Sequence, residues 1–387
     1  MSSDALLFPE FEDPFVELHT TGLLPSQKLE DLIEAGHIRA NVPICPDQIQ
    51  PSSIDLRLGS IAYRIRASFL PTPNATVESK LQQVKVEEID ISGPTVLHKG
   101  FVYLVPLEEA LSLPESISGK ANPKSTTGRL DIFTRLITDY GNEFEYVRPG
   151  YRGKLYAEIA PLTFSVFVRR GTRLNQLRLR RGSPPPSDAM LFRLHEREPI
   201  VYSQDASAVE PTISEGLRLS VDLLGLEGSD IVGYKAKKRR ETPPIDLAQM
   251  GHYAPEEFWE PVLRNAKKSV VLEPGEFYIL RSREKVSIPP ESAAEMVPYD
   301  PSVGEFRIHY AGFFDPGFGW GSDDQRGTHA VLEVRSHDVP SLLEHGQVVC
   351  RLIYERLLAR PARLYGREIG SAYQSQRLAL SKQFRCW

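Results

Sequence analysis

The chain has 387 residues, of which 41% are hydrophobic and 25% are charged, and its formal net charge is −5. This composition is ordinary for a globular protein, and a chain of this length is expected to form two domains. The small net charge excludes a protein that binds nucleic acid by its overall charge.

Short elements are expected along most of the chain. Residues 1–20 are acidic and aromatic and are expected to form an arm. Ser26 is a suitable N-cap for a short helix with Leu29, Leu32 and Ile33 on one face and Gly36 at its end. Frequent breaks by 31 prolines and 27 glycines then favour many short strands. The clearest strand patterns are residues 101–105, 155–159, 164–168, 277–280, 330–334 and 348–353.

Three segments of the middle of the chain interrupt this pattern. Residues 182–187, rich in proline, are expected to end the first set of strands. Residues 235–244 contain the run KKRR and are expected to be a solvated surface loop, with a phosphate or nucleic-acid contact as the alternative. Residues 253–265 are expected to form a short helix with Pro255 near its start.

Cysteine usage and the N-terminal residues indicate a cellular location. Cys45, Cys350 and Cys386 form no CxxC pair, so neither a disulfide framework nor a thiolate metal site is expected. Residues 1–9 lack the pattern of a signal peptide, and no stretch approaches the roughly 20 apolar residues that span a bilayer. We therefore expect a cytoplasmic protein without membrane or nucleic-acid partners.

The chain repeats itself at an offset of about 170 residues, the mark of duplicated domains. The matched positions are Asp55 and Asp222, Gly100 and Gly275, Gly150 and Gly317, and Glu158 and Glu333. We expect a mainly β protein with two tandem distorted β-barrel or jelly-roll domains and a few short helices. The expected boundaries are residues 1–20 for the arm, 21–195 for the first domain and 196–387 for the second.

The segment PKSTTGR at residues 123–129 is the best candidate for binding phosphate. Lys124 and Arg129 supply positive charge, Ser125 and Thr126 supply hydroxyls, and Gly128 permits a tight turn. A polar turn between two strands would have the same composition, so this segment alone leaves both interpretations open.

Two glutamates at equivalent positions are candidates for acid–base chemistry. Glu333 lies in the apolar run AVLEV and Glu158 in LYAEI. A carboxylate among apolar neighbours is partly desolvated, which raises its pKa toward the range useful for proton transfer. The alternative for each is a solvent-facing glutamate on an edge strand.

Several motifs in this order resemble the dCTP deaminase family, which has the dUTPase-like fold. They are QPSSIDLRLG at residues 50–59, the KST-x-x-R segment from Lys124, the DPGF hairpin from Asp315 that leads to Glu333, and the tail from Tyr365 to Gln376. Together they cover most of the chain, once per copy. The tandem arrangement resembles the long, duplicated form of this enzyme in some bacteria.

The resemblance implies hydrolysis of dCTP to dUTP and ammonia by a glutamate that acts as a general base on water, helped by a serine and an arginine. It implies no catalytic metal, and Mg²⁺ would be bound only through the substrate triphosphate. The zinc-deaminase signature is absent from the sequence, in agreement with this expectation. The family further implies inhibition by dTTP and oligomerisation as a trimer, with a monomer as the alternative for a two-copy chain.

The two copies retain different parts of the family pattern. The first keeps Lys124, where the family usually has arginine, with Ser125, Thr126 and Arg129, but its hairpin has Arg148 in place of aspartate and an insertion at residues 138–147. The second keeps the hairpin, but its turn, VPYDPS at residues 297–302, has two prolines and an aspartate and cannot hold a triphosphate.

We therefore predict a composite site. The first copy would supply the phosphate ligands Lys124, Ser125, Thr126 and Arg129, and the second would supply Ala311, Asp315 and the base Glu333, with Tyr365 and Gln376 closing over the nucleotide. Glu158 remains the alternative base. The family's tail lysine position is Ala372, so the resemblance gives no lysine there.

Two other functions are compatible with these motifs. Asp315 lies near the place where dUTPases carry a water-activating aspartate, so a dUTP diphosphatase, or a bifunctional enzyme that forms dUMP from dCTP, is the first alternative. A non-catalytic nucleotide-binding regulator is the second, although both glutamates are present.

Overall fold

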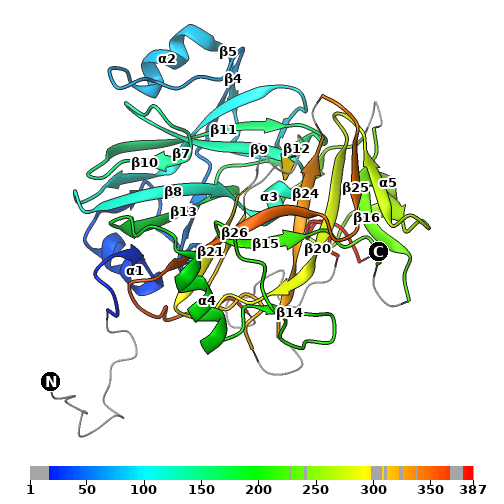
Figure 1. Cartoon of the computed structure of the whole chain (residues 1–387). Coiled ribbons are helices and arrows are strands. Elements are labelled where there is room, and N and C mark those ends of the chain that lie inside the picture. The colour runs from blue at the N-terminus through cyan, green and yellow to red at the C-terminus, as the bar shows by residue number, and fades with distance from the viewer. Residues whose placement is uncertain are drawn as a thin grey trace, which may run out of the picture.

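The computed structural model describes residues 17–225, 228–238, 242–297, 307–308, 312–321, 326–336, 338–366 and 378–386, the side chains of residues 307–308 excepted. Most of these residues belong to short strands arranged as two barrel-like units that lie side by side (Figure 1). Within the described residues, no helix is long and apolar enough to cross a membrane.

The first unit holds three short α-helices, one 3-10 turn and thirteen strands among the described residues. The helical elements are α1 (Ser26–Glu34), the 3-10 turn η2 (Pro46–Gln48), α2 (Val77–Val84) and α3 (Ser125–Gly128). The strands are β1 (Gly22–Leu23), β2 (Ile38–Ala40), β3 (Ile54–Arg57), β4 (Ile61–Ile65), β5 (Lys85–Asp90), β6 (Thr95–Leu97), β7 (Val102–Ser112), β8 (Ile117–Pro123), β9 (Ile132–Thr138), β10 (Tyr146–Val147), β11 (Arg152–Pro161), β12 (Val166–Val168) and β13 (Arg173–Arg181).

The second unit follows the same plan in its described part. Its helices are α4 (Asp188–Arg197) and α5 (Pro255–Phe258). Its strands are β14 (Val201–Tyr202), β15 (Leu217–Ser220), β16 (Ile231–Ala236), β17 (Ile245–Asp246), β18 (Trp259–Leu263), β19 (Ser269–Leu272), β20 (Phe277–Val286), β21 (Ser292–Val297), β22 (Arg307–Ile308), β23 (Phe313–Phe314), β24 (Thr328–Arg335), β25 (Ser341–Glu344) and β26 (Val348–Arg356).

Strand order confirms the duplication. One sheet runs β5-β4-β7-β11-β9 in the first unit and β18-β16-β20-β24-β22 in the second, so each strand has a counterpart in the same place. The second pair of sheets, β3-β13-β8-β10 and β15-β26-β21-β23, matches in the same way, and β1 is a further strand that pairs with the other end of β13. The prediction of a mainly β protein with two tandem barrel domains is therefore confirmed.

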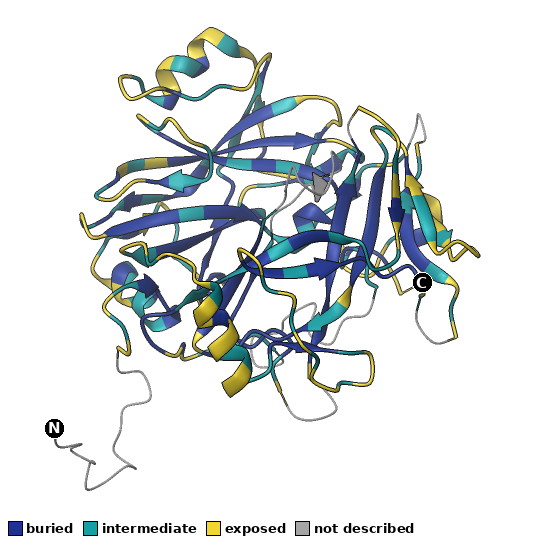
Figure 2. Cartoon of the chain, in the orientation of Figure 1, coloured by how far each residue is buried: buried dark blue, intermediate teal, exposed yellow. Residues whose placement is uncertain are grey.

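The two units share a β-sheet and part of a hydrophobic core. Strand β17 of the second unit pairs in parallel with β12 of the first, so that it completes the small sheet β17-β12-β6. Phe258 and Trp259, which follow β17, are buried in the core of the first unit together with Phe164. Figure 2 shows the long central strands as buried and α2 as exposed.

Most predicted elements form where the sequence pattern placed them, with two errors. The helix α1 begins at Ser26, although Pro25 is the N-cap and the Ser26 side chain makes no cap hydrogen bond. The helix predicted over residues 253–265 is wrong beyond its first turn: α5 ends at Phe258 and β18 follows. Pairing of β18 with β16 overrides the helical pattern, because residues 259–263 complete the edge of a sheet.

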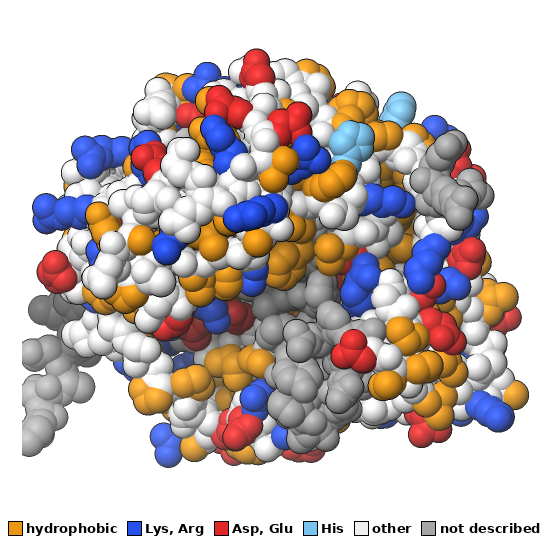
Figure 3. All heavy atoms as spheres, turned by 90° about the horizontal axis from the view of Figure 1, so that it is seen from above, with side chains coloured by type: hydrophobic (Ala, Val, Ile, Leu, Met, Phe, Trp, Pro, Cys, Tyr) orange, Lys and Arg blue, Asp and Glu red, His pale blue; other side chains and the backbone are white. Residues whose placement is uncertain are grey.

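The loop with the basic run and the arm lie partly outside the described residues. Lys235 belongs to β16, and Lys238 pairs with Glu276 at 2.8 Å, whereas residues 239–241 and the arm residues 1–16 are not described. On the face in Figure 3, acidic and basic side chains are interspersed.

The domain boundaries at residues 20 and 195 stay predictions.

Candidate functional site

The turn predicted to bind phosphate connects β8 to β9 at the edge of the first unit. It forms the single helical turn α3, which is hydrogen-bonded to the start of β13. The backbone N–H of Lys124 donates to the Leu174 carbonyl at 2.8 Å, and the Thr127 hydroxyl donates to the same oxygen at 3.0 Å. Because Thr127 holds the inner side, Ser125 and Thr126 remain half-buried on the outer side.

Glu333 reaches this turn from the other unit. In β24, Ala330, Leu332 and Val334 pack into the second core, so the alternating residues Val331 and Glu333 point to the opposite face. That face lies against the first unit, and Val331 belongs to the first unit's core. Glu333 is therefore buried between the two copies, at 6% exposure.

The contact between the turn and Glu333 is close enough to require glycine. A methyl group added to Gly128 would stand 2.6 Å from Oε2 of Glu333 and 3.0 Å from Oε1. The structure thus brings together the turn of the first copy and the glutamate of the second.

Burial dominates the electrostatics of Glu333. Desolvation raises the pKa of Glu333 to about 8; the nearby guanidinium of Arg129 lowers it and the carboxylate of Asp131 raises it. Asp131 itself accepts hydrogen bonds from Thr163, at 2.5 Å, and from Arg335. A carboxyl group with a pKa near neutrality can both accept and donate a proton.

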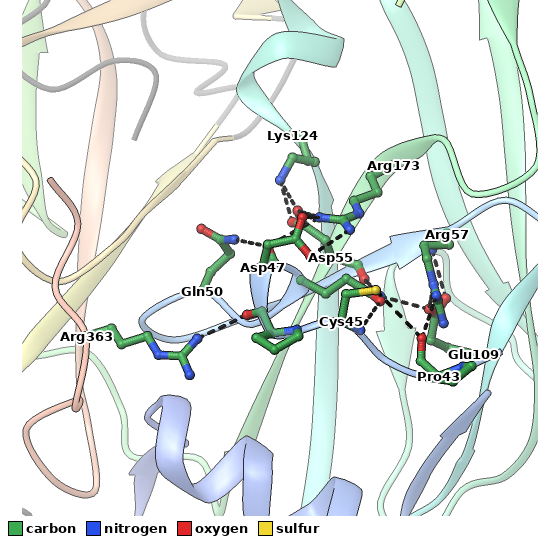
Figure 4. A network of polar contacts seen from close by, with 12 residues as sticks. Pro43, Cys45, Asp47, Gln50, Asp55, Arg57, Glu109, Lys124, Arg173 and Arg363 are labelled. Atoms are coloured by element: carbon green, nitrogen blue, oxygen red, sulfur yellow. Dashed lines mark hydrogen bonds and ion pairs between the residues drawn. The ribbon is translucent and has the colours of Figure 1, made fainter. Parts of the chain in front are cut away.

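Lys124 belongs to a network of charged side chains on the other side of the turn (Figure 4). Its Nζ lies 2.5 Å from both carboxylate oxygens of Asp55, and Arg173 reaches Asp47 at 3.0 Å and Asp55 at 3.9 Å. Burial raises the pKa of Asp55, while the charge of Lys124 opposes that rise. Lys124 is therefore held by a nearly inaccessible counter-ion.

A pocket of about 340 Å³ opens beside this network, and we call it the cationic pocket. Lys124, Thr126, Arg173 and Lys382 line it, with Asp55 as a wall residue. Burial, together with the charge of Lys124, lowers the pKa of Lys382. Cationic side chains at this density favour an anionic ligand.

Sequence reasoning missed Arg173 and Lys382. Arg173 is the first residue of β13 and precedes its buried residues, and an arginine at the start of a strand does not by itself indicate a binding site. Lys382 lies ten residues after Ala372, the place where the motif would put a tail lysine, so only its neighbours in space identify it.

The residues predicted to bind the nucleobase or to close over the nucleotide make contacts with residues outside the turn. Asp315 is buried, and its Oδ1 accepts hydrogen bonds from Ser52 at 2.7 Å and Arg178 at 3.1 Å, both from the first copy. Tyr365 packs on Phe318 with ring centroids 5.6 Å apart. Ala311, Gln376 and residues 298–302 lie outside the described residues.

Glu158 has different surroundings from Glu333. Its Oε1 accepts a hydrogen bond from Arg135 at 2.5 Å, and its Oε2 is buried without a hydrogen-bond partner among the described residues. Arg135 lies 3.5 Å over the ring of Phe144 and donates to Ser68 at 2.9 Å. In the first copy, therefore, the space beside Glu158 is filled by Arg135 from the same copy.

Comparisons with known proteins agree in both halves. The family model of the 2'-deoxycytidine 5'-triphosphate deaminase N-terminal domain matches residues 20–183, and that of the C-terminal domain matches residues 187–384. The crystal structure of 2'-deoxycytidine 5'-triphosphate deaminase from Agrobacterium tumefaciens is 47% identical with a TM-score of 0.83, over 88% of this chain and 100% of that chain.

Shorter relatives align with about the length of one copy. The dUMP-forming dCTP deaminase of Methanothermobacter thermautotrophicus is 29% identical over 143 residues, which are 36% of this chain and 68% of the relative. The protein of the same name from Streptomyces avermitilis is 28% identical over 164 residues, 42% of this chain and 82% of the relative.

The packing of Gly128 against Glu333 generates a stability prediction. Gly128→Ala is expected to lower the free energy of unfolding by about 1–3 kcal/mol, because the new methyl group overlaps the carboxylate. Urea denaturation measures this change. Gly93→Ala is the matched control, since a methyl group there meets nothing within 4 Å. Equal stability of the two variants would contradict the described contact.

Proposed function

The chain belongs to the 2'-deoxycytidine 5'-triphosphate deaminase family, and from this premise we propose that it converts dCTP to dUTP and ammonia at one composite site per chain. The observation that supports this proposal most is the burial of Glu333 against Gly128, beside Arg129. That contact joins the copy with the phosphate turn to the copy with the intact hairpin.

The proposed chemistry needs one group that takes a proton and returns it. Water adds to C4 of the cytosine ring, one of its protons ends on N3 and the other on the amino group, and the C4–N bond breaks so that ammonia leaves and C4 becomes a carbonyl carbon. Glu333 in its ionised form takes a proton from the water and passes it to the leaving amine. Arg129 steadies the carboxylate by its charge, and Ser125 orients the water.

The cationic pocket supports a place for the triphosphate. Lys124, Arg173 and Lys382 would neutralise its charge, and the hydroxyl of Thr126 would donate to a phosphate oxygen. Mg²⁺ would arrive as part of the substrate, bound to the phosphates. Lys124 would exchange its contact with Asp55 for one with the nucleotide.

Formation of dUMP, with release of pyrophosphate, is the second candidate. It is favoured by the similarity to the shorter relatives, which are named as dUMP-forming dCTP deaminases. The contacts of Asp315 favour simple deamination instead, because Ser52 and Arg178 already bind the carboxylate that would have to activate water. The first candidate is therefore preferred.

The product distribution decides between the two candidates. Purified chain incubated with dCTP and Mg²⁺ is expected to release ammonia and dUTP without pyrophosphate. Ammonia and pyrophosphate are detected separately, and the nucleotide is identified by chromatography. Equal amounts of both products would establish the dUMP-forming reaction, and absence of ammonia would overturn deamination.

The two glutamates are expected to respond differently to the same substitution. Glu333→Gln should lower kcat by about 10²–10⁴-fold, since the amide cannot accept the proton from water. Glu158→Gln is the matched control and should leave kcat within a few-fold, even if it lowers stability by breaking the pair with Arg135. Loss of activity in Glu158→Gln alone would contradict the composite site.

The raised pKa of Glu333 predicts the pH dependence. A base must be ionised, and the pKa of Glu333 is about 8, so kcat/KM should increase with pH and level off above about 8. Initial rates between pH 6 and about 9.5 measure this limb. A limb centred near pH 4.5 would mean that Glu333 is solvated or is not the base.

A further inference from the structure

The last described residues of the chain, 378–386, are docked against the segment that the second copy inserts between β16 and β18. Tyr253 and Phe384 form a parallel bridge, and the N–H groups of Gly251 and His252 donate to the carbonyls of Lys382 and Gln383 at 2.9 and 2.8 Å. The side chain of Gln383 donates to the Leu247 carbonyl at 3.0 Å.

Aromatic packing holds this end in place. The ring of Phe384 lies 5.4 Å from that of Phe258 and 6.0 Å from that of Trp259, in edge-to-face arrangements. These two rings in turn pack on Phe164 of the first copy, at 5.7 and 5.6 Å. The cluster of Phe164, Tyr253, Phe258, Trp259 and Phe384 is called the aromatic anchor below. Edge-to-face pairs of buried rings fix both position and orientation.

The docked segment contacts the turn on its way to the anchor. Nη1 of Arg129 donates to the Ala379 carbonyl at 3.0 Å, and the Ser381 hydroxyl donates to the Thr126 carbonyl at 3.0 Å. Ser381 and Gln383 are each 1% exposed, and both contacts to the turn are at least partly buried. The carbonyl that receives Arg129 is thus placed by the anchor together with the hydrogen bond from Ser381 to the turn.

We propose that the aromatic anchor is a positioning device for the active site, and that Phe384 is a positioning residue which fixes the Arg129 guanidinium beside Glu333 through the Ala379 carbonyl. This inference rests on the proposed function, because its test measures the rate of dCTP deamination. It assigns a purpose to the insertion at residues 237–258, which the deamination chemistry itself does not use.

The equivalent insertion of the first copy has another use, which strengthens the assignment. Residues 66–84, between β4 and β5, cover the outer face of β11: Val77 and Leu81 pack with Tyr156, and Ser68 binds Arg135. One insertion therefore closes the surroundings of Glu158, whereas the other docks the chain end that contacts Arg129. Only the second lies on the side of the composite site.

The test compares Phe384→Ala with Phe384→Leu and with Cys386→Ser, an exposed change in the same segment. Phe384→Ala should lower kcat by about ten- to a hundredfold, because small displacements of a catalytic group have effects of this size. Phe384→Leu should recover most of that loss, and Cys386→Ser should match the unchanged chain. Thermal unfolding of each variant sets an assay temperature at which all are folded.

The pH profile separates positioning from a general loss of structure. Among the described residues, Arg129 and Asp131 are the charged groups that act on Glu333, and Arg129 is the one that lowers its pKa. A loosened Arg129 therefore raises the pKa of Glu333, so the acidic limb of kcat/KM should move to higher pH in Phe384→Ala. A structural role alone would reduce the amount of active enzyme without moving that limb.

Each outcome is decisive. A lower kcat with a shifted limb supports the proposal, and an unchanged limb in a folded Phe384→Ala variant overturns it. If Phe384→Ala does not fold, Ser381→Ala, which removes the hydroxyl contacts to the Thr126 carbonyl and to the Gln383 side chain, should give a smaller kcat loss with a shift in the same direction, and no shift overturns the proposal. Failure of the unchanged chain to release ammonia from dCTP would instead refute the proposed function.

Discussion

A carboxylate buried between two copies of one fold is the constraint on which the rest of this structure depends. Water is excluded from Glu333 by β24 on one side and by the turn at Gly128 on the other. Burial strongly disfavours the charged form, and one guanidinium, that of Arg129, opposes this effect. Neither copy alone could create this environment, because one supplies the carboxylate and the other supplies both the cover and the cation.

The duplication explains how the two copies could diverge. If the interface between the copies holds the active site, as proposed, then the turn of the second copy and the surroundings of Glu158 in the first are no longer needed for catalysis. Glu158 illustrates the result: it keeps its place in β11, but Arg135 and Phe144 occupy the space around it. The extra segments at residues 66–84 and 237–258 occur at equivalent positions, but the first packs on Tyr156 and the second on Phe164 and Phe384.

Much of this organisation could be predicted from the sequence, since it depends on local signals. Alternating apolar residues located β11, β24 and β26, and the offset between equivalent residues revealed the tandem units. The pairing of the first copy's turn with Glu333 was predicted from complementary losses in the two copies. Whether these residues perform the predicted roles stays a prediction.

Other features could not be predicted because they depend on contacts between distant parts of the chain. The pair of Lys124 and Asp55 joins segments that carry no shared pattern, and Lys382 and Arg173 meet only in the folded molecule. The parallel bridge of Tyr253 and Phe384 is a single residue pair and has no periodicity. The same long-range pairing explains the wrong helix over residues 253–265, where the edge of a sheet decides the conformation of β18.

Strand β17 has a consequence for how the protein is made. The small sheet of the first unit is complete only when β17 has joined β12, and its core only when Phe258, Trp259 and Phe384 have been added. During synthesis the first half therefore leaves the ribosome with an open sheet edge and an unfilled core. Its native form requires β17, Phe258, Trp259 and Phe384 from the second half, so the two halves are expected to unfold as one cooperative unit.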